Sequence, residues 1–127
     1  MMFLQKLNPE WVLRIGLGAM YLWSGLDIVR HPKSWYWAIR SLPEFAEAAI
    51  GRVGIDMFLM IQGAGELLLA VLLLAPFLPR RLLRWVAFLN ALEIALILLL
   101  VGVDAVTFRD IGVLGGAVAL WLLALRS

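Results

Sequence analysis

Residues 55–78 read IDMFLMIQGAGELLLAVLLLAPFL, and residues 82–103 read LLRWVAFLNALEIALILLLVGV. Each stretch is close to the ~20 apolar residues that a helix needs to cross the hydrocarbon core of a bilayer. Two prolines near the end of the first stretch, followed by Arg80 and Arg81, predict a tight turn, because proline interrupts helices. Short connections place consecutive helices side by side and antiparallel. This region therefore predicts a pair of antiparallel membrane-spanning helices.

Two more apolar stretches extend the pattern in both directions. They cover residues 11–29 and 111–125, and the second is the shortest of the four, with charged residues at both of its ends. Such side chains can extend to the membrane surface, so a short apolar stretch can still span. The connection over residues 104–110 is also short. We therefore predict an all-α fold: a single domain over residues 1–127, built as an integral membrane bundle of four antiparallel helices.

The composition agrees with a membrane location and excludes several classes of protein. Hydrophobic residues make up 64% of the 127 residues, against roughly 45–50% in soluble globular domains. The chain has no cysteine and a single histidine, His31, which excludes an Fe–S protein, bis-His haem ligation within one chain and a thiol-based redox enzyme. With nitrogen and sulfur ligands this scarce we predict no metal site. No basic stripe is present, so we predict no nucleic-acid partner.

The connection over residues 30–54 is the longest in the chain. Its first part, residues 31–37, places aromatic rings among charges, as the lipid headgroup zone favours. Over residues 43–52, small and apolar side chains can share one helix face opposite charged ones. We predict that residues 32–53 form an interfacial segment with a short helix lying on the membrane surface. The aromatic cluster could instead line a ligand pocket.

Charge counts favour a multi-pass topology with both termini in the cytoplasm, because lysine and arginine are enriched in cytoplasmic loops. In this orientation the cytoplasmic side carries Lys6, Arg14, Arg80, Arg81, Arg84 and Arg126. The opposite side carries Arg30, Lys33, Arg40, Arg52 and Arg109. The cytoplasmic side thus has one more lysine or arginine than the opposite side, and this excess sets the predicted orientation.

Two carboxylic acids lie near the middle of predicted spans. Glu66 follows Gln62 by about one helical turn. Glu93 lies three residues after Asn90. An ionised carboxylate at this depth costs a few kcal/mol or more, so each side chain must face the bundle and find a partner or a proton. If the two acids are close together, burial and mutual repulsion predict that one of them is protonated at neutral pH.

Arg14 is the predicted partner of these acids. It lies one turn inside the first span, and an extended guanidinium and a glutamate side chain together can cover the rise of roughly 9 Å to the midplane. The same helix face carries Gly18, Tyr21 and Gly25. Small residues allow a neighbouring helix to approach closely, and Tyr21 could hydrogen-bond into the same interior.

The candidate site residues follow from these positions. The candidates for proton or ligand handling are Glu66, Glu93 and Arg14, and those for binding a cofactor or ligand are Tyr21, Gln62, Asn90, Arg109 and Asp110. Buried polar side chains also bond across helices and fix their register, at roughly 0.6–2 kcal/mol each. Helix packing is therefore an equal alternative for the first three, and the favoured one for Gln62 and Asn90. Helix capping alone could explain Asp110.

Four short stretches occur in the same order as in a known family. LRIGLG at residues 13–18 precedes WSG at residues 23–25, GAGEL occupies residues 63–67, and TFRDIG occupies residues 107–112. They resemble the opening of the first helix, the Gly-x-x-Glu-Leu element of the second helix and the start of the last helix of DoxX-like membrane proteins. Many members carry a lysine shortly after the helix-one glycine. This chain has Ile28 there, so no role of that lysine is carried over.

The resemblance implies an accessory membrane subunit of a quinone-linked oxidoreductase in a prokaryotic cytoplasmic membrane. It implies quinone as the cofactor and a redox protein as the partner within the lipid bilayer, and it marks Arg14, Glu66, Arg109 and Asp110. No cofactor ligands are evident in the chain itself. The residues leave two other functions open: a small oligomeric transporter or channel that uses the midplane acids, and a non-catalytic membrane scaffold.

Overall fold

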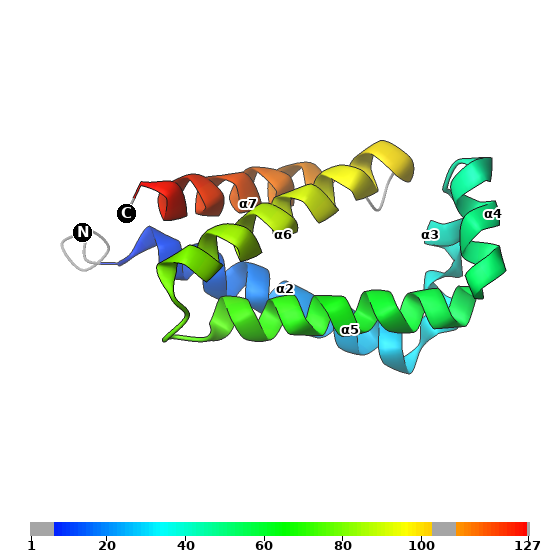
Figure 1. Ribbon diagram of the computed structural model, residues 1–127, viewed down its shortest axis with the longest axis horizontal. Coiled ribbons are helices and arrows are strands. Elements are labelled where there is room, and N and C mark those ends of the chain that lie inside the picture. Colours follow the sequence, from blue (N-terminus) through cyan, green and yellow to red (C-terminus); the bar gives the residue numbers. More distant parts are fainter. Residues whose placement is uncertain (1–6, 103–108, 127) are drawn as a thin grey trace.

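The computed structural model describes residues 7–102 and 109–126, and its regular structure in those ranges is all helical (Figure 1). The helices are α2 (Pro9–Arg30), the 3-10 helix η1 (Pro32–Trp35), α3 (Tyr36–Arg40), α4 (Glu44–Val53), α5 (Ile55–Leu74), α6 (Arg80–Leu100) and α7 (Asp110–Leu125). The predicted all-α class is confirmed. α2 begins and α7 ends at one end of the molecule, whereas α3 and α4 lie at the opposite end of α5 (Figure 1).

Prolines set the turn between α5 and α6. α5 ends at Leu74 and not at residue 78, because proline disfavours helical backbone in the residue before it, and Pro76 follows Ala75, whose backbone is extended. α6 begins at Arg80, directly after Pro79 at its N-cap. The predicted tight turn is therefore present, and the helices around it are displaced by a few residues from the apolar runs.

Glycines bring α2 and α5 into close contact. A Cβ atom added to Gly63 would lie 3.1 Å from the carbonyl oxygen of Gly25 and 2.8 Å from Cγ2 of Val29. Nearer the other end of α5, a Cβ atom added to Gly18 would lie 2.7 Å from Cγ of Leu74. These contacts confirm that Gly18 and Gly25 allow a neighbouring helix to approach closely, as small residues do between membrane helices.

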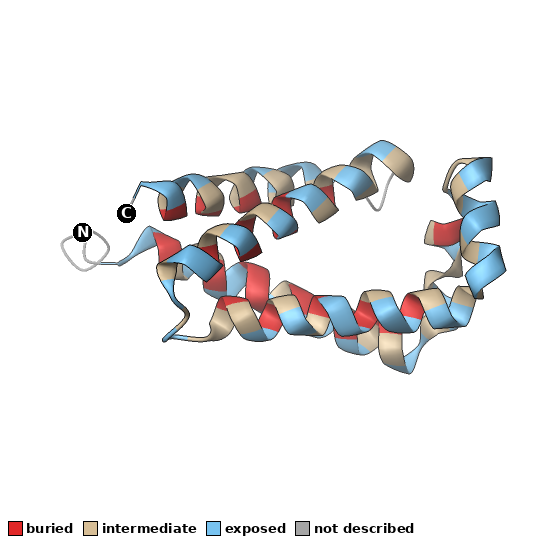
Figure 2. Ribbon diagram, viewed as in Figure 1, coloured by how far each residue is buried: buried red, intermediate tan, exposed pale blue. Residues whose placement is uncertain are grey.

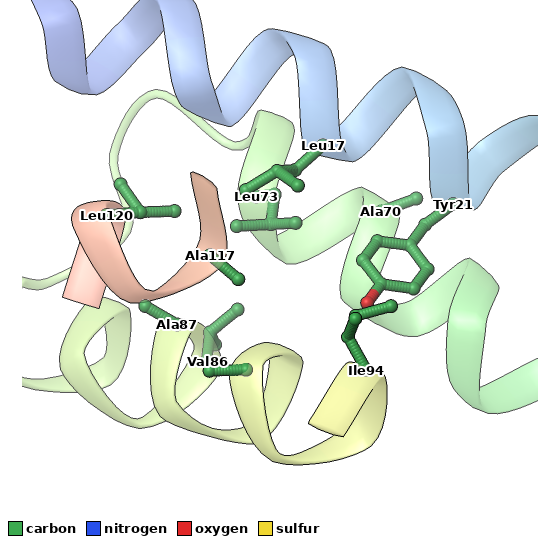
Figure 3. Packing of buried hydrophobic residues seen from close by; sticks show 10 residues of the cluster. Leu17, Tyr21, Ala70, Leu73, Val86, Ala87, Ile94, Ala117 and Leu120 are labelled. Carbon is green, nitrogen blue, oxygen red and sulfur yellow. The ribbon is translucent and has the colours of Figure 1, made fainter. Parts of the chain in front are cut away.

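α6 and α7 form a second pair, and the main core lies between the two pairs (Figure 3). Arg84 Nε, near the start of α6, donates a hydrogen bond of 3.0 Å to the carbonyl oxygen of Ala124, near the end of α7. These two helices are therefore antiparallel. All four long helices contribute buried side chains to this core: Leu17, Tyr21, Ala70, Leu73, Val86, Ala87, Ala91, Ile94, Ala117 and Leu120.

The connection between α2 and α5 folds as η1, α3 and α4, which confirms a short helix within predicted segment 32–53. Ile39 of α3 is buried with Ile28 and Leu59 in a second apolar cluster. α4 has no buried residue, and its Phe45 is 74% exposed. The segment is thus fixed through η1, α3 and Ile50 of α4, while Phe45 and Val53 of α4 offer apolar side chains to the surroundings. Its location on a membrane surface stays a prediction.

Two hydrogen bonds attach the aromatic residues of this segment to the ends of the long helices. Trp35 Nε1 donates to Asp27 Oδ2 of α2 at 2.9 Å. The Tyr36 hydroxyl donates to Asp56 Oδ1 of α5 at 2.5 Å, and this hydrogen bond raises the pKa of Tyr36. The aromatic residues therefore help to position the segment across the ends of α2 and α5.

The outward faces of the long helices are apolar, and the buried residues face the space between them (Figure 2). Leu99 is 78% exposed and Trp23 is 68% exposed. Soluble monomers rarely show apolar surface on this scale. α2, α5 and α6 are each long and apolar enough to cross a membrane, as a membrane protein requires.

α7 is shorter than the other long helices. Its 16 residues correspond to about 24 Å, compared with about 30 Å for the hydrocarbon core. The described residues thus contain three candidate membrane spans, where the sequence predicts four. Most of the predicted connection over residues 104–110 lies outside the described residues.

Candidate functional site

A groove along α5 and α6 contains both predicted midplane acids. Its volume is about 370 Å³, and we call it the midspan groove. Its lining residues are Ile61, Gln62, Gly65, Glu66, Leu68, Leu69, Leu89 and Glu93. Ile61 and Leu68 are 61% and 60% exposed, and no atom lies within 4 Å of a Cβ atom built on Gly65. The groove therefore opens on the apolar outer surface of the molecule.

The helical repeat brings the polar groups of the midspan groove together. Gln62 and Glu66 lie one turn apart and project from the same side of α5. Gln62 Nε2 donates a hydrogen bond of 2.7 Å to Glu93 Oε1 on α6. Ser24 Oγ on α2 donates a hydrogen bond of 2.9 Å to Glu66 Oε1. The two carboxyl groups thus link three helices through neutral donors, and within residues 7–102 and 109–126 neither forms a salt bridge.

Tyr21 and Asn90 form a second polar contact deeper in the core. The Tyr21 hydroxyl donates a hydrogen bond to Asn90 Oδ1, and Asn90 is fully buried. Asn90 Nδ2 has no hydrogen-bond partner among the described protein groups. A buried donor left in this state costs about 1–3 kcal/mol. The side chain therefore favours an additional acceptor, such as a water molecule or a ligand oxygen.

Asp110 adds a third carboxyl group to this part of the molecule. It lies in the first turn of α7, where the helix dipole favours an acid. Its charge acts on both Glu66 and Tyr21, and the charge of Glu93 acts on the same two residues. Glu66, Glu93 and Tyr21 thus lie within electrostatic range of one another, and Asp110 lies within range of Glu66 and Tyr21, although it does not line the groove. Arg109 is an exposed residue directly before α7.

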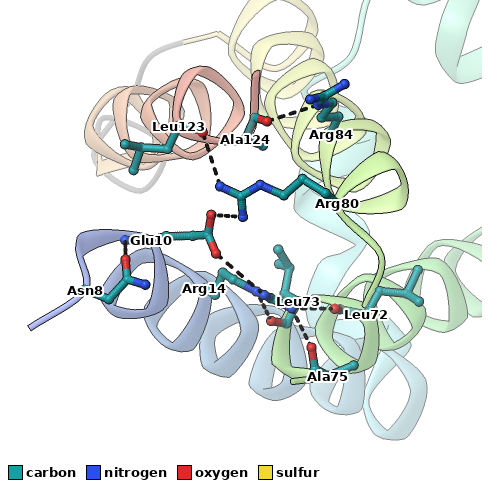
Figure 4. Close-up of polar contacts among 10 residues, drawn as sticks. All are labelled: Asn8, Glu10, Arg14, Leu72, Leu73, Ala75, Arg80, Arg84, Leu123 and Ala124. Atoms are coloured by element: carbon teal, nitrogen blue, oxygen red, sulfur yellow. Dashed lines mark hydrogen bonds and ion pairs between the residues drawn. The ribbon is translucent and has the colours of Figure 1, made fainter. Parts of the chain in front are cut away.

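Arg14 lies elsewhere, so its predicted pairing with the midplane acids is wrong (Figure 4). Its Nε donates to the carbonyl oxygen of Leu73 at 2.8 Å, and its Nη2 donates to that of Ala75 at 2.6 Å. The last carbonyl groups of a helix have no partner within the helix and favour a nearby cation. Leu73 lies seven residues after Glu66, or about 10 Å along α5. Arg14 therefore caps α5 and does not reach the groove.

Arg14 belongs to a group of charged residues that we call the terminal cluster: Glu10, Arg14, Arg80 and Arg84 (Figure 4). Glu10 forms an ion pair with Arg80 and lies 3.9 Å from Arg14. Arg80 also donates to the carbonyl oxygen of Leu123 at 3.4 Å. Arginine side chains therefore bind carbonyl groups at the C-terminal ends of both α5 and α7.

Sequence reasoning missed Ser24 and Glu10 as members of these two groups. Ser24 lies three residues after Tyr21 and could have been placed on the same face of α2 by the helical repeat. Glu10 lies in the first turn of α2, where an acid is explained by the helix dipole alone. Its ion pair with Arg80 joins residues 70 positions apart, so no local sequence pattern predicts this contact.

Among residues 7–102 and 109–126, no three acidic, histidine or cysteine side chains lie together as a metal site requires. Comparisons with models of protein families, with curated proteins and with solved structures give no match. The resemblance to DoxX-like proteins therefore stays a prediction, and the function has to be argued from the groove.

Proposed function

We propose that this chain is an accessory membrane subunit of a quinone-linked oxidoreductase and that quinone binds in the midspan groove. In this proposal α2, α5, α6 and α7 all cross a prokaryotic cytoplasmic membrane as one antiparallel bundle, with both termini in the cytoplasm. The observation that carries the proposal is the position of Glu66, Glu93 and Gln62 in a groove that opens among apolar side chains. The resemblance to DoxX-like proteins supports the same function.

The groove suits a quinone in size, access and hydrogen bonding. Its volume of about 370 Å³ falls within the roughly 300–1,000 Å³ of small-molecule sites. Exposed Ile61 and Leu68 at its edge would allow a hydrophobic ligand to enter from the lipid. Quinone carbonyl oxygens accept hydrogen bonds, which the amide of Gln62 or a protonated carboxyl group can donate.

The groove residues have the properties needed to hold and exchange protons. A bound quinone would supply chemistry that couples electrons to protons. Ser24 holds Oε1 of Glu66, and Gln62 holds Oε1 of Glu93, so the second oxygen of each carboxyl group is the atom proposed to give or take a proton. Positioned carboxyl groups of this kind act as general acids and bases.

Electrons would come from a partner. The chain has no cysteine and one histidine, so it cannot ligate an Fe–S cluster or supply both axial histidines of a haem. A redox protein bound to the bundle, or an organic cofactor held by such a partner, would deliver them. The subunit would therefore contribute a binding site, proton exchange and anchoring to the membrane.

A second candidate function is the passage of protons or cations. It is favoured by the position of Glu66 and Glu93 in one groove between apolar side chains, because acids inside a membrane are typical of proton and ion pathways. Four helices can barely enclose such a pathway, so this function would require a homo-oligomer.

Mass spectrometry of the protein gently purified from its native membrane tests the first proposal. We expect a stoichiometric quinone, an oxidoreductase subunit, or both to co-purify. A Glu66→Leu/Glu93→Leu variant, which removes both polar groups, should lose quinone, while a Glu44→Leu/Glu47→Leu variant, which makes the same change on exposed α4, should retain it. Ordinary lipid as the only companion of a folded native protein would contradict the proposal.

Flux measurements in liposomes separate the second candidate from the first. A proton or cation flux that disappears in a Glu66→Gln/Glu93→Gln variant and persists in a Glu44→Gln/Glu47→Gln variant of exposed α4 would support transport. A quinone-binding subunit without a pathway should show no flux under any gradient.

A further inference from the structure

We propose that the outer face of α6 and α7 carries a specific site for an anionic phospholipid, separate from the midspan groove. The site is a hollow of about 340 Å³ lined by Arg84, Trp85, Phe88, Trp121 and Leu125. We call it the lipid hollow. Its lining combines one cation with aromatic and aliphatic side chains, which is the chemistry of a phosphate group attached to acyl chains.

The order of these residues along the two helices matches the polarity of a lipid. α6 starts and α7 ends at the same end of the molecule, as the Arg84–Ala124 hydrogen bond shows. Arg84 therefore lies at the outer end of the lipid hollow. Phe88 lies one turn, or about 6 Å, further toward the middle of α6, and Trp121 lies one turn before Leu125 on α7. A headgroup beside Arg84 would thus direct its chains along aromatic rings toward the membrane interior.

Aromatic contacts give the lipid hollow a built shape. The ring centroids of Phe88 on α6 and Trp121 on α7 lie 5.2 Å apart, so the two rings pack together between the helices. Trp85 packs edge-on to Phe88 at 6.3 Å and is itself 61% exposed. Scattered interfacial tryptophans are common in membrane proteins, but here the rings border one concavity that also contains an arginine.

Charge at this end of the molecule favours an anionic headgroup. The described residues around the hollow and the adjoining helix ends include five arginines, Arg14, Arg80, Arg81, Arg84 and Arg126, and one acid, Glu10. Glu10 is already engaged by Arg14 and Arg80. Arg84 lines the hollow and is anchored through Nε to the carbonyl oxygen of Ala124 on α7, which holds its side chain at the edge of the hollow. Basic pockets between membrane helices bind anionic headgroups for this reason.

Native mass spectrometry of the purified full chain with an equimolar mixture of phosphatidylglycerol and phosphatidylcholine tests the site. We expect bound phosphatidylglycerol to predominate. Arg84→Gln should lower its occupancy about fivefold, the effect of losing about one charge contact at the membrane surface. Arg81→Gln removes the same charge from an exposed neighbour that does not line the hollow, so it should change occupancy by less than about twofold.

A second variant covers the case in which Arg84→Gln loosens the pairing of α6 and α7. Trp85→Ala removes an exposed wall of the hollow and leaves Arg84 bound to Ala124, so the protein should stay folded and bind less phosphatidylglycerol. Inorganic phosphate at millimolar concentration should not displace the lipid, because phosphate lacks the acyl chains that the rings contact. Equal binding of both lipids, equal losses in Arg84→Gln and Arg81→Gln, full occupancy in Trp85→Ala, or displacement by phosphate would each overturn the proposal.

Discussion

The terminal cluster and the midspan groove both contain buried carboxyl groups, yet their partners differ. Glu10 in the terminal cluster is held by Arg80 and lies beside Arg14, whose hydrogen bonds go to helix-end carbonyl groups. Glu66 and Glu93 in the groove accept hydrogen bonds from Ser24 and Gln62. One region neutralises its charges within the fold, whereas the other holds its acids only by neutral groups.

This difference separates a structural role from a chemical one. Removing one partner from a buried ion pair leaves an uncompensated charge and is strongly destabilising. Carboxyl groups held by a hydroxyl or an amide can change protonation without losing an ion pair. We therefore expect changes in the terminal cluster to affect stability, and changes in the midspan groove to affect ligand binding.

The largest effect is expected from Arg14→Met. This substitution removes the donors to the carbonyl oxygens of Leu73 and Ala75 and leaves Glu10 with one cation fewer. Because hydrogen bonds to charged groups contribute roughly 1.5–3 kcal/mol each, the free energy of unfolding should fall by about 3 kcal/mol. Denaturation of the detergent-solubilised protein would measure it. Arg81→Met, at an exposed position, is the control, and similar losses in both variants would break the comparison.

Tyr21→Phe should have the next largest effect. It leaves Asn90 Oδ1 without the Tyr21 hydroxyl, beside an Nδ2 that already has no partner among the described groups. A loss of about 1–3 kcal/mol is expected for an unsatisfied buried group. Tyr21→Phe/Asn90→Leu removes both polar partners and should recover most of that loss, measured by the same denaturation. Failure of the double variant to recover would show that the pair does more than satisfy its own hydrogen bond.

Gly65→Leu sharpens the comparison by filling the midspan groove without touching its charges. No atom lies within 4 Å of a Cβ atom at Gly65, so the free energy of unfolding should change by less than about 1 kcal/mol. Because the leucine side chain would fill the groove, quinone affinity should fall at least about tenfold, which corresponds to about 1.4 kcal/mol. Gly16→Leu is the matched control, because Gly16 is equally open and lies outside the groove. Quinone binding to nanodisc-embedded protein would report it, and equal affinity in both variants would contradict the site.

The smallest effect is expected from Tyr36→Phe, at the exposed end of the molecule. The hydrogen bond to Asp56 raises the pKa of Tyr36, so folding favours the protonated phenol. Its contribution should be complete below the ordinary tyrosine pKa of about 10 and should disappear as the pH rises past the folded value. The difference in Tm between native protein and variant should therefore close only above about pH 10. A difference that stays constant would contradict the role of this bond.

The sequence predicts the helices well and the partners of their charged residues less well. Apolar runs identify α2, α5 and α6. The thickness of the hydrocarbon core requires about 20 consecutive apolar residues in a helix that spans it, and such a run is easy to recognise. Proline then moves the end of α5 to Leu74, a local effect that hydropathy does not include. The sequence also predicts that the last helix is the shortest of the four, and α7 is shorter than α2, α5 and α6. Whether α7 crosses the membrane depends on its surroundings and stays part of the proposal.

The site is a similar case. Glu66, Glu93, Gln62, Tyr21, Asn90 and Asp110 could be predicted as a group, because each is a polar residue in or at the end of an apolar stretch. The position of Arg14 could not, because a side chain in the first turns of α2 can reach either the acids or the end of α5, and only the pairing of the helices decides between them. Ser24 could not be assigned to the site from the sequence, because a serine in a membrane helix can also bond to its own backbone, as its contact with the Tyr21 carbonyl oxygen shows.

The most direct test of the central claim is photo-crosslinking of the nanodisc-embedded protein with a photoreactive quinone analogue, followed by mapping of the labelled peptides. The account predicts labels concentrated on residues 61–69 of α5 and 89–93 of α6, reduced by excess unlabelled quinone and by Gly65→Leu. Labels spread evenly over the lipid-facing helices, or concentrated near the terminal cluster, would contradict it.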